Sequence, residues 1–211
     1  MDAIIMAGGF GSRLGMGEKP CVELLGKPLI TYVIDTLQRT GSIGDIYVAV
    51  SPATPRTASF IQEKYDGKVM VIPTGGGNYV GDMVYAVKAA CITDPLLILM
   101  ADLPLLTPEL LEKVIKEYKT CGKPAMSIFS PICVCKSLGI RPDTVFNWEG
   151  KGELIVPSGI NIMDGNDVDH EQDYVSLVLD NIELALNINT VEDLQRCKDI
   201  LLERKAESIS N

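Results

Sequence analysis

The chain has few of the residues on which several classes of site depend. It contains one histidine, His170, and six cysteines without a Cys-x-x-Cys pair. This composition disfavours a zinc site of the usual ligand spacing and leaves little choice of a histidine base. His170 lies in an acidic run and is interpreted as a solvated side chain. The cysteines are expected to be reduced, structural thiols. The one tight pair is Cys133 and Cys135. On a strand both would point to one face, but a metal site would need further ligands, which the sequence does not place.

Long apolar runs and an excess of basic residues are also missing. No run approaches the roughly 20 residues that cross a bilayer, and no basic segment with a longer apolar stretch opens the chain. We therefore expect no membrane span and a cytoplasmic location. The formal net charge of −9 argues against a nucleic-acid-binding face, which needs clustered Lys and Arg. A small phosphorylated ligand needs only a few local cations and backbone N–H groups, so it stays compatible.

Apolar segments and helical patterns alternate along the chain, which is typical of βαβ units. The 211 residues, 46% of them hydrophobic, suffice for one domain, 1–211. We expect an α/β fold, a three-layer, doubly wound and mostly parallel sheet of Rossmann-like type. The segment 131–180, rich in glycine and proline, is expected to be an inserted loop and hairpin region, and 203–211 a fraying tail. The expected strands are 3–6, 46–50, 69–72, 96–100 and 125–129, and the expected helices begin at Pro28, Tyr79, Thr107-Pro108 and Thr190.

A glycine-rich loop follows the first expected strand, from Ala7 to Pro20. Its five glycines allow tight turns and bring N–H groups close to phosphate oxygens, while Arg13 and Lys19 add positive charge. The loop fits neither the dinucleotide fingerprint, since Leu14 stands where the third glycine should be, nor the nucleoside-triphosphatase form, since no Ser or Thr follows Lys19. The sequence therefore predicts a phosphate-binding loop of another kind.

Asp102 follows the apolar run 96–100, where the strand's carboxyl end opens on the expected ligand crevice. A carboxylate there can hold Mg²⁺ that bridges triphosphate oxygens, or it can cap the turn before Pro104. We favour the metal role because the phosphate-binding loop lies nearby.

Several segments together resemble the nucleotidyltransferase superfamily over nearly the whole chain. They are Ala7-Gly8-Gly9 with Arg13-Leu14 and Lys19-Pro20, the turn 26–29, Ala101-Asp102-Leu103-Pro104, and Asn187-Ile188-Asn189-Thr190. Within the superfamily the chain is most similar to the archaeal GTP:adenosylcobinamide-phosphate guanylyltransferases. That narrower resemblance is carried by the segments 18–20, 51–55 and, above all, 156–161, Val-Pro-Ser-Gly-Ile-Asn.

The resemblance implies that GMP moves from GTP to adenosylcobinamide phosphate, with Mg²⁺ as cofactor and a homodimer as the assembly. Arg13, Lys19 and Asp102 would be the catalytic residues, and Asp102 and Asn187 would hold the metal. Asn187 and Asn189 are equally typical of turns or caps. Asp82 would either accept hydrogen bonds from the guanine edge or cap a helix. Gly159 would either contact the ligand or form a β-bulge. The implied nucleotide contacts are Ala7, Gly8, Gly9, Gly11, Arg13, Lys19, Ser51, Asp82, Asp102, Gly159, Asn161, Asn187 and Asn189.

Two other functions remain open at this point. The protein would either be another transferase of the superfamily, acting on molybdopterin or on a sugar or alditol phosphate, or a nucleotide-sensing regulator without turnover. The presence of Asp102 argues against the regulator, since sensing needs no catalytic metal ligand. In a transferase the nucleophile is a substrate phosphate, mostly ionised at neutral pH because its second pKa is about 6, so no general base is required.

Overall fold

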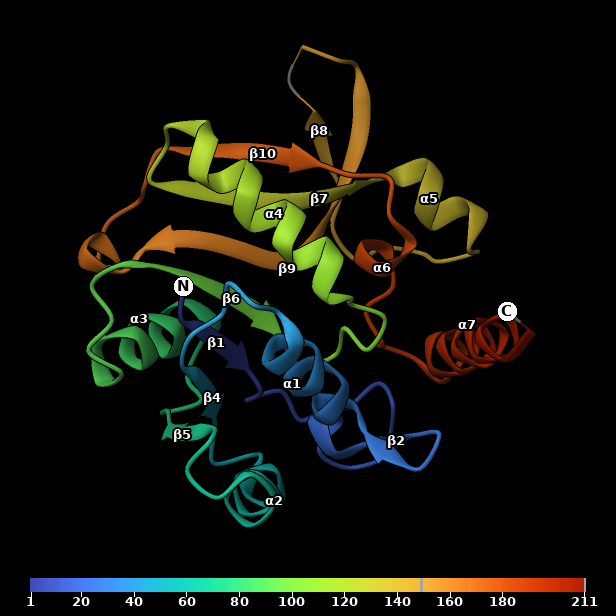
Figure 1. Cartoon of the computed structure of the whole chain (residues 1–211), viewed down its shortest axis with the longest axis horizontal. Coiled ribbons are helices and arrows are strands. Elements are labelled where there is room, and N and C mark those ends of the chain that lie inside the picture. The colour runs from blue at the N-terminus through green and yellow to red at the C-terminus, as the bar shows by residue number, and fades with distance from the viewer. Residues whose placement is uncertain (149, 211) are drawn as a thin grey trace.

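A computed structural model describes residues 1–148 and 150–210 and has an α/β architecture built on one large sheet (Figure 1). Seven strands of this sheet follow the order β10-β7-β9-β6-β1-β4-β5, and β8 pairs with β9 outside that order. A short antiparallel pair, β2 (Glu23–Leu24) and β3 (Lys27–Pro28), stands apart. The strands of the large sheet are β1 (Ala3–Met6), β4 (Ile46–Val50), β5 (Met70–Pro73), β6 (Pro95–Met100), β7 (Ala125–Pro131), β8 (Phe146–Trp148), β9 (Glu153–Asp164) and β10 (Tyr174–Val178).

The parallel block β6-β1-β4-β5 forms the N-terminal half of the sheet. Its strands are short apolar runs because both of their faces are covered. In β1, Ala3 and Ile5 join one core cluster, whereas Ile4 and Met6 join the cluster on the opposite face. The expected strands at 3–6 and 46–50 are confirmed to the residue, and that at 69–72 is displaced by one position.

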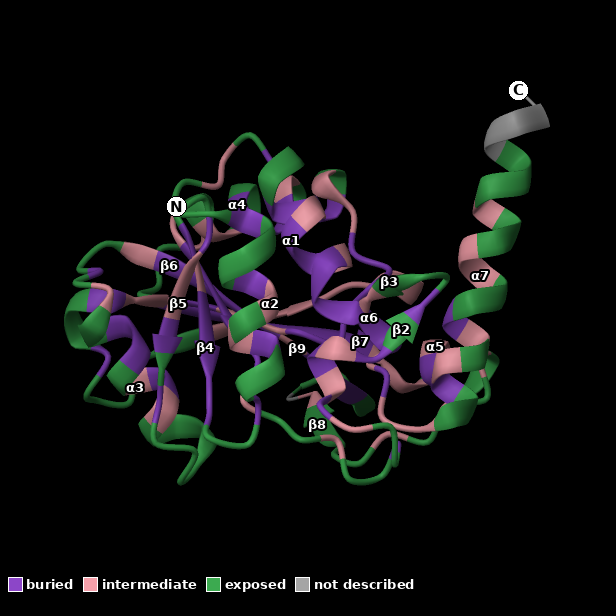
Figure 2. Cartoon of the chain, turned by 90° about the horizontal axis from the view of Figure 1, so that it is seen from below, coloured by how far each residue is buried: buried purple, intermediate pink, exposed green. Residues whose placement is uncertain are grey.

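Helices lie on both faces of the sheet, so the three-layer arrangement is confirmed. Side chains of α1 (Leu29–Arg39), α2 (Pro55–Tyr65) and α4 (Pro108–Cys121) belong to the cluster on one face, and those of α3 (Tyr79–Ala89) to the cluster on the other. Buried residues follow the strands and the inner sides of these helices (Figure 2). The remaining helices are α5 (Ile132–Ser137), α6 (Ile182–Ala185), α7 (Val191–Ser210) and the single turns η1 (Lys19–Cys21) and η2 (Gly165–Asp167).

The helix starts expected from the sequence are present. The Thr107 hydroxyl accepts from the N–H of Leu110 at 3.3 Å and caps α4, which has Pro108 in its first turn. At α7 the hydroxyl of Thr190 accepts from the N–H of Asp193 at 3.1 Å, and the Asp193 carboxylate accepts from the N–H of Thr190 at 2.9 Å. This is a capping box with Asp in the place of Glu. The helix continues to Ser210, so the segment 203–210, expected to be a fraying tail, is helical, and residue 211 lies outside the described residues.

The segment 131–180 contains the expected hairpin as β8 and β9, but β9 then continues into the middle of the sheet. There it pairs antiparallel with both β6 and β7, and β10 adds a parallel strand beyond β7. The sheet is therefore mostly parallel with one antiparallel strand inside it. None of the helices in the described part of the chain is long and apolar enough to cross a membrane.

Candidate nucleotide site

The loop after β1 turns back on itself so closely that its glycines are required. Gly11 has a φ of +70°, and a Cβ on it would lie 2.6 Å from the Cβ of Lys19. Gly15 and Gly17 also have positive φ values, a region that side chains rarely tolerate. The loop is thus folded over the start of η1, and this places Lys19 beneath it.

Lys19 links the loop to two distant segments of the chain. Its ammonium donates to the Asp102 carboxylate and, at 2.7 Å, to the amide oxygen of Asn189. Asp102 is 5% exposed and the Lys19 side chain 15% exposed, so the pair is largely shielded from water. The structure therefore brings together three of the residues picked from the sequence, from positions more than eighty residues apart.

The surroundings of Asp102 suit a bound cation. One of its oxygens, Oδ1, is buried and has no hydrogen-bond partner among the described residues. The backbone carbonyl of Asp102 accepts from the N–H of Ile188 at 3.2 Å, which lays the segment Asn187-Ile188-Asn189 alongside. The described residues contain no cluster of three acidic, His or Cys groups that could hold a metal alone. A hard cation held here by a carboxylate and amide oxygens would therefore need further oxygen ligands from a substrate.

Gly159 and Asn187 lie next to this pair. The Asn187 side chain donates to the Ser158 carbonyl at 3.3 Å, and a Cβ on Gly159 would meet Met100 at 2.8 Å and the Asn187 amide at 3.2 Å. Gly159 has a φ of +80°, and the pairing of β7 with β9 shifts register beside it. The register shift fits the β-bulge that was one of the alternatives for Gly159, and the missing Cβ lets β9 pass close to the end of β6.

Three more of the sequence-chosen residues lie close together: Gly8 after β1, Ser51 after β4 and Asp82 in the first turn of α3. The Ser51 hydroxyl donates to the Gly8 carbonyl at 2.8 Å, and a Cβ on Gly76 would lie 3.1 Å from the Cβ of Ser51. Asp82 accepts from the N–H of Gly76 at 3.0 Å, whereas the cap of α3 is Asn78, which accepts from Gly81. Asp82 therefore holds the loop 75–77 in place and is not the N-cap.

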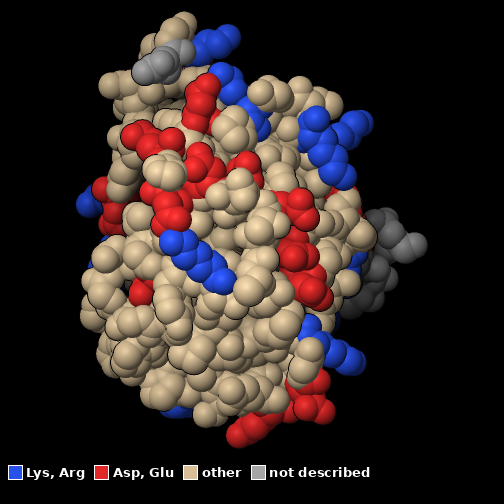
Figure 3. All heavy atoms as spheres, turned by 90° about the vertical axis from the view of Figure 1, so that its left-hand side faces the viewer, with Lys and Arg blue, Asp and Glu red and all other residues tan. Residues whose placement is uncertain are grey.

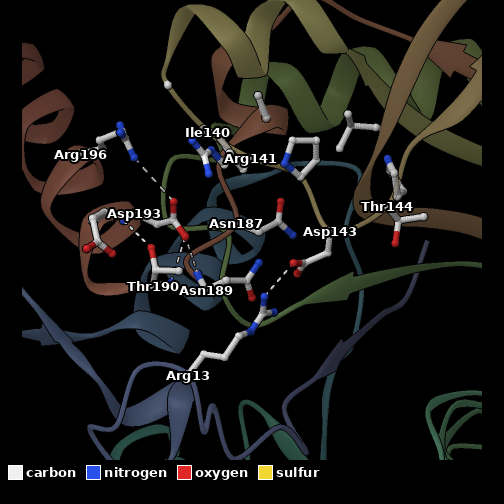
Figure 4. A pocket seen from close by; sticks show the side chains of 16 residues that line it. Arg13, Ile140, Arg141, Asp143, Thr144, Asn187, Asn189, Thr190, Asp193 and Arg196 are labelled. Atoms are coloured by element: carbon white, nitrogen blue, oxygen red, sulfur yellow. Dashed lines mark hydrogen bonds and ion pairs between the residues drawn. The ribbon is translucent and has the colours of Figure 1, made fainter.

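A cavity of about 600 Å³ opens beside Asn187 and Asn189 (Figure 4). Arg13 reaches into it and pairs with Asp143 at 2.8 Å, and both side chains are more than half exposed. In the view of Figure 4, Arg13 lies on one side of the two asparagines and Arg141 and Arg196 lie on the other. Nothing in the sequence pattern singled out Arg141 or Arg196, since neither belongs to a recognisable motif.

A second cavity, of about 830 Å³, lies over the face of β7, β9 and β10 that turns away from α4. Gly159 and Asn161 line it, so these two sequence-chosen residues share one face of β9. Phe129 and Phe146 make an edge-to-face contact across it, with ring centroids 6.0 Å apart. The other aromatic residues of the lining are Trp148 and Tyr174.

Sequence reasoning missed the task of Glu18, although it noted the residue beside Lys19. Glu18 is 5% exposed, and its carboxylate accepts from the N–H groups of Arg56 and Thr57 at 2.8 and 2.7 Å. These are the first free N–H groups of α2, where an acidic cap is favourable. Glu18 therefore fixes the end of the phosphate-binding loop to a helix.

The cysteines and the histidine take no part in these contacts. Cys133 and Cys135 lie on α5 and not on a strand, and Cys135 is buried while Cys133 is exposed. The condition under which both would point to one face, a strand, is therefore not met. Burial raises the pKa of Cys197 to about 12 and also raises the pKa of Cys135. His170 is exposed and contacts Asp167 at 2.6 Å, as a solvated histidine would.

Comparison with known proteins extends these observations. The model of the MobA-like NTP transferase domain matches residues 3–139. An adenosylcobinamide-phosphate guanylyltransferase of Methanocaldococcus jannaschii is 31% identical over 203 residues, 95% of this chain and 97% of the relative. A probable molybdenum cofactor guanylyltransferase of Thermococcus gammatolerans is 32% identical over 125 residues, 59% of this chain and 60% of the relative.

Among solved structures, a CMP:2-keto-3-deoxy-manno-octonic acid synthetase complexed with CTP is similar with a TM-score of 0.70. The match covers 96% of this chain and 98% of that one at 15% identity. At this identity the similarity is evidence for the fold alone.

Proposed function

Since the chain belongs to the MobA-like NTP transferase family, we propose that it transfers GMP from GTP to adenosylcobinamide phosphate and releases pyrophosphate. The observation that carries this proposal is the buried contact of Lys19 with Asp102 and Asn189, where the glycine-rich loop meets the end of β6. The relative from M. jannaschii, which matches over nearly its whole length, supports the choice of acceptor.

GTP binds with its triphosphate over the loop that begins at Ala7, Gly8 and Gly9 and ends at Lys19. N–H groups that no Cβ obstructs donate to the phosphate oxygens, and Lys19 and Arg13 neutralise their charge. The base lies toward Ser51 and the loop 75–77, whose position Asp82 fixes. Asp82 is the candidate acceptor for the guanine N1–H and N2–H₂ groups.

Asp102, with Asn187 and Asn189, would hold a Mg²⁺ ion. The buried and unpartnered Oδ1 of Asp102 fits this role, and the single carboxylate is enough when the substrate phosphates supply the other ligands. When bound, the ion would stabilise negative charge on the phosphate oxygens. Lys19 would then donate to a phosphate oxygen in place of the Asp102 carboxylate that it contacts in the free protein.

Transfer proceeds by attack of an acceptor phosphate oxygen on the α-phosphorus of GTP. The new P–O bond forms as the bond to the β-phosphate bridging oxygen breaks, and that oxygen leaves with pyrophosphate. Because the nucleophile is already ionised, the residues act by positioning and by neutralising charge. The aromatic cavity over β7, β9 and β10 gives the large corrinoid acceptor an apolar surface next to Gly159 and Asn161.

The test is release of pyrophosphate by the purified chain with GTP, Mg²⁺ and adenosylcobinamide phosphate. ATP, CTP and UTP replace GTP in parallel reactions, and molybdopterin or a sugar phosphate replaces the acceptor. We expect turnover only with GTP and the corrinoid. Turnover with another acceptor would instead assign a different transferase activity, and GTP binding without any turnover would indicate a regulator. The homodimer stays a prediction, which sedimentation equilibrium tests.

A further inference from the structure

The cavity beside Asn187 and Asn189 is lined by Arg13 of the nucleotide loop and by two further arginines, Arg141 and Arg196, to which the nucleotide loop assigns no task. Arg141 is exposed and makes no hydrogen bond or ion pair with any residue that the structure describes. Arg196 has only a loose contact with Asp193 at 3.9 Å. The Asp193 carboxylate already accepts from the N–H groups of Asn189 and Thr190, so it is committed to capping α7. Of the two remaining carboxylates of the lining, Asp143 pairs with Arg13, and Glu192 is exposed.

The Arg196 guanidinium lies against the turn that follows α5, at a glycine. Gly139 has a φ of +65°, and a Cβ there would lie 3.0 Å from Nη2 of Arg196. The turn after α5 thus lets Arg196 lie against the chain and face the cavity in which Arg141 stands two residues farther along. Planar guanidinium groups bind phosphate through two parallel hydrogen bonds, which a lysine cannot do.

The position of the cavity shows which phosphate it suits. Asn189, one of its lining residues, accepts from Lys19, so the cavity opens beside the Lys19–Asp102 pair. In an in-line displacement the attacking and leaving oxygens lie on opposite sides of the phosphorus. Under the proposed function, the loop 7–19 binds the phosphates that leave as pyrophosphate. The attacking phosphate of the acceptor must therefore approach the α-phosphorus from the opposite side, which other residues line.

The extent of the family match also indicates that this cavity receives the acceptor. The part shared with the MobA-like NTP transferase model ends at residue 139, and of the cavity's lining only Arg13 and Gly139 fall within it. Family members that transfer a nucleotide in the same way but to different acceptors must differ in the residues that bind the acceptor. We propose that Arg141 and Arg196 form a subsite for the phosphate monoester of the acceptor, an inference that rests on the proposed function.

The experiment uses the full chain with two ligands, adenosylcobinamide phosphate and its unphosphorylated counterpart. Arg141→Ala and Arg196→Ala should each raise KM for the phosphorylated acceptor by about ten- to a hundredfold, as expected when one charge-assisted contact is lost. Inhibition by the unphosphorylated counterpart and the Kd of GTP should stay as in the wild type. Arg39→Ala, at an exposed arginine of α1 away from both cavities, is the matched control and should change none of these values.

The other outcomes are distinct. A rise in the Kd of GTP that matches the rise in acceptor KM would assign the arginines to the triphosphate and overturn the subsite. Inhibition by the unphosphorylated counterpart that weakens as much as the acceptor KM rises would show contact with the corrinoid body and not with its phosphate, and would overturn the subsite. If the wild type transfers GMP, and a variant with both arginines replaced by alanine has an unchanged KM for the acceptor, the subsite is overturned while the proposed function stands. If the wild type binds GTP but transfers nothing to this acceptor, the proposed function fails and the subsite with it.

Discussion

At the scale of single residues, the contact between Lys19 and Asp102 determines how charge is balanced in the site of the free protein. An ammonium and a carboxylate that are mostly buried neutralise each other, because either charge alone would be costly to remove from water. The same carboxylate is the one expected to hold Mg²⁺, so lysine and metal compete for it. Lys19 is therefore the counter-ion of Asp102 in the free protein, and under the proposed function it would become a phosphate ligand in the complex.

Replacing Lys19 by Met keeps the length of the side chain and removes its charge. We expect the loss of transition-state stabilisation to be about 2–4 kcal/mol, the amount that one preorganised donor contributes. In metal-free buffer the melting temperature should fall because Asp102 is left buried without a counter-ion, and Mg²⁺ should restore it more than it raises that of the wild type. Thermal unfolding with and without Mg²⁺ measures this, with Lys27→Met, from the exposed pair with Asp35, as control. Equal effects of Mg²⁺ on variant and wild type would contradict the competition.

Replacing Asp102 by Asn keeps the size and one acceptor oxygen but removes the ligand charge. We expect a folded protein that still binds GTP through the loop and loses guanylyl transfer by about a hundred- to a thousandfold. Raising Mg²⁺ should recover part of the rate. Full activity in the variant, or a wild type that works equally well in excess chelator, would show that Asp102 is no metal ligand.

At the scale of elements, the parts that the sequence predicted are those with a strong local signal. The first two parallel strands were located to the residue because a run such as Ile46–Val50 is apolar throughout, as a strand covered on both faces must be. The helix α2 was missed because its sequence is polar, with Thr57, Ile61 and Tyr65 as its buried residues. The place of β9 was missed as well, since Pro157 and Gly159 within it look like turn residues. Only the pairing with β6 and β7, which is not local, makes this segment a central strand.

The same reasoning explains which parts of the site could be found in advance. Asp102 stands directly after the apolar strand β6, and Lys19 stands where the loop after the apolar strand β1 ends, so topology brings both to one edge of the sheet. Arg141 and Arg196 come together through the turn at Gly139 and the direction of α7, and no spacing in the sequence encodes that meeting. The acceptor side is therefore where the sequence was least informative.

The joint between the phosphate-binding loop and α2 leads to a prediction at this scale. Glu18→Gln retains one acceptor oxygen but replaces the other with a donor that faces the N–H of a helix N-terminus. We expect the free energy of unfolding to fall by about 0.5–2 kcal/mol, as for loss of an N-cap, and the KM for GTP to rise because Lys19 follows directly. Urea unfolding and steady-state kinetics measure both, with Glu63→Gln on the exposed side of α2 as the matched control. Lower stability with unchanged KM would mean that the loop is held independently of α2.

At the scale of the whole molecule, charge is distributed unevenly between surface and site. On the face shown in Figure 3, acidic and basic side chains are interspersed and a broad area carries neither. The net charge of −9 gives the molecule a repulsive field for anions. A triphosphate and a phosphate monoester can then be bound only where local cations outweigh that field. In the described part of the chain, Arg13, Lys19, Arg141 and Arg196 lie around one edge of the sheet and would be such cations under the proposed function.

The buried acids of the molecule set its behaviour at high pH. Burial raises the pKa of Cys197 from 9.0 to about 12, and it also raises the pKa of Cys135, Cys21 and Tyr65. In the unfolded chain these groups lose their protons near their ordinary pKa values, while in the folded chain they keep them. Above about pH 9 the unfolded state therefore binds fewer protons than the folded state, and stability must fall as pH rises.

We expect the free energy of unfolding to be level below about pH 9 and to decline from there toward about pH 12, where the Cys197 thiol itself ionises. One group with a shifted pKa contributes at most about 1.4 kcal/mol per pH unit in this window. Urea unfolding at several pH values gives the slope for the wild type and for Cys197→Ala. The variant is less stable throughout because its core contains a cavity, but its slope should be shallower since one buried acid is gone. Cys91→Ser, at an exposed cysteine, is the matched control and should keep the wild-type slope. If Cys197→Ala declined as steeply as the wild type, the alkaline loss would arise from the tyrosines and the other thiols, and Cys197 would not be the group that burial in α7 holds protonated.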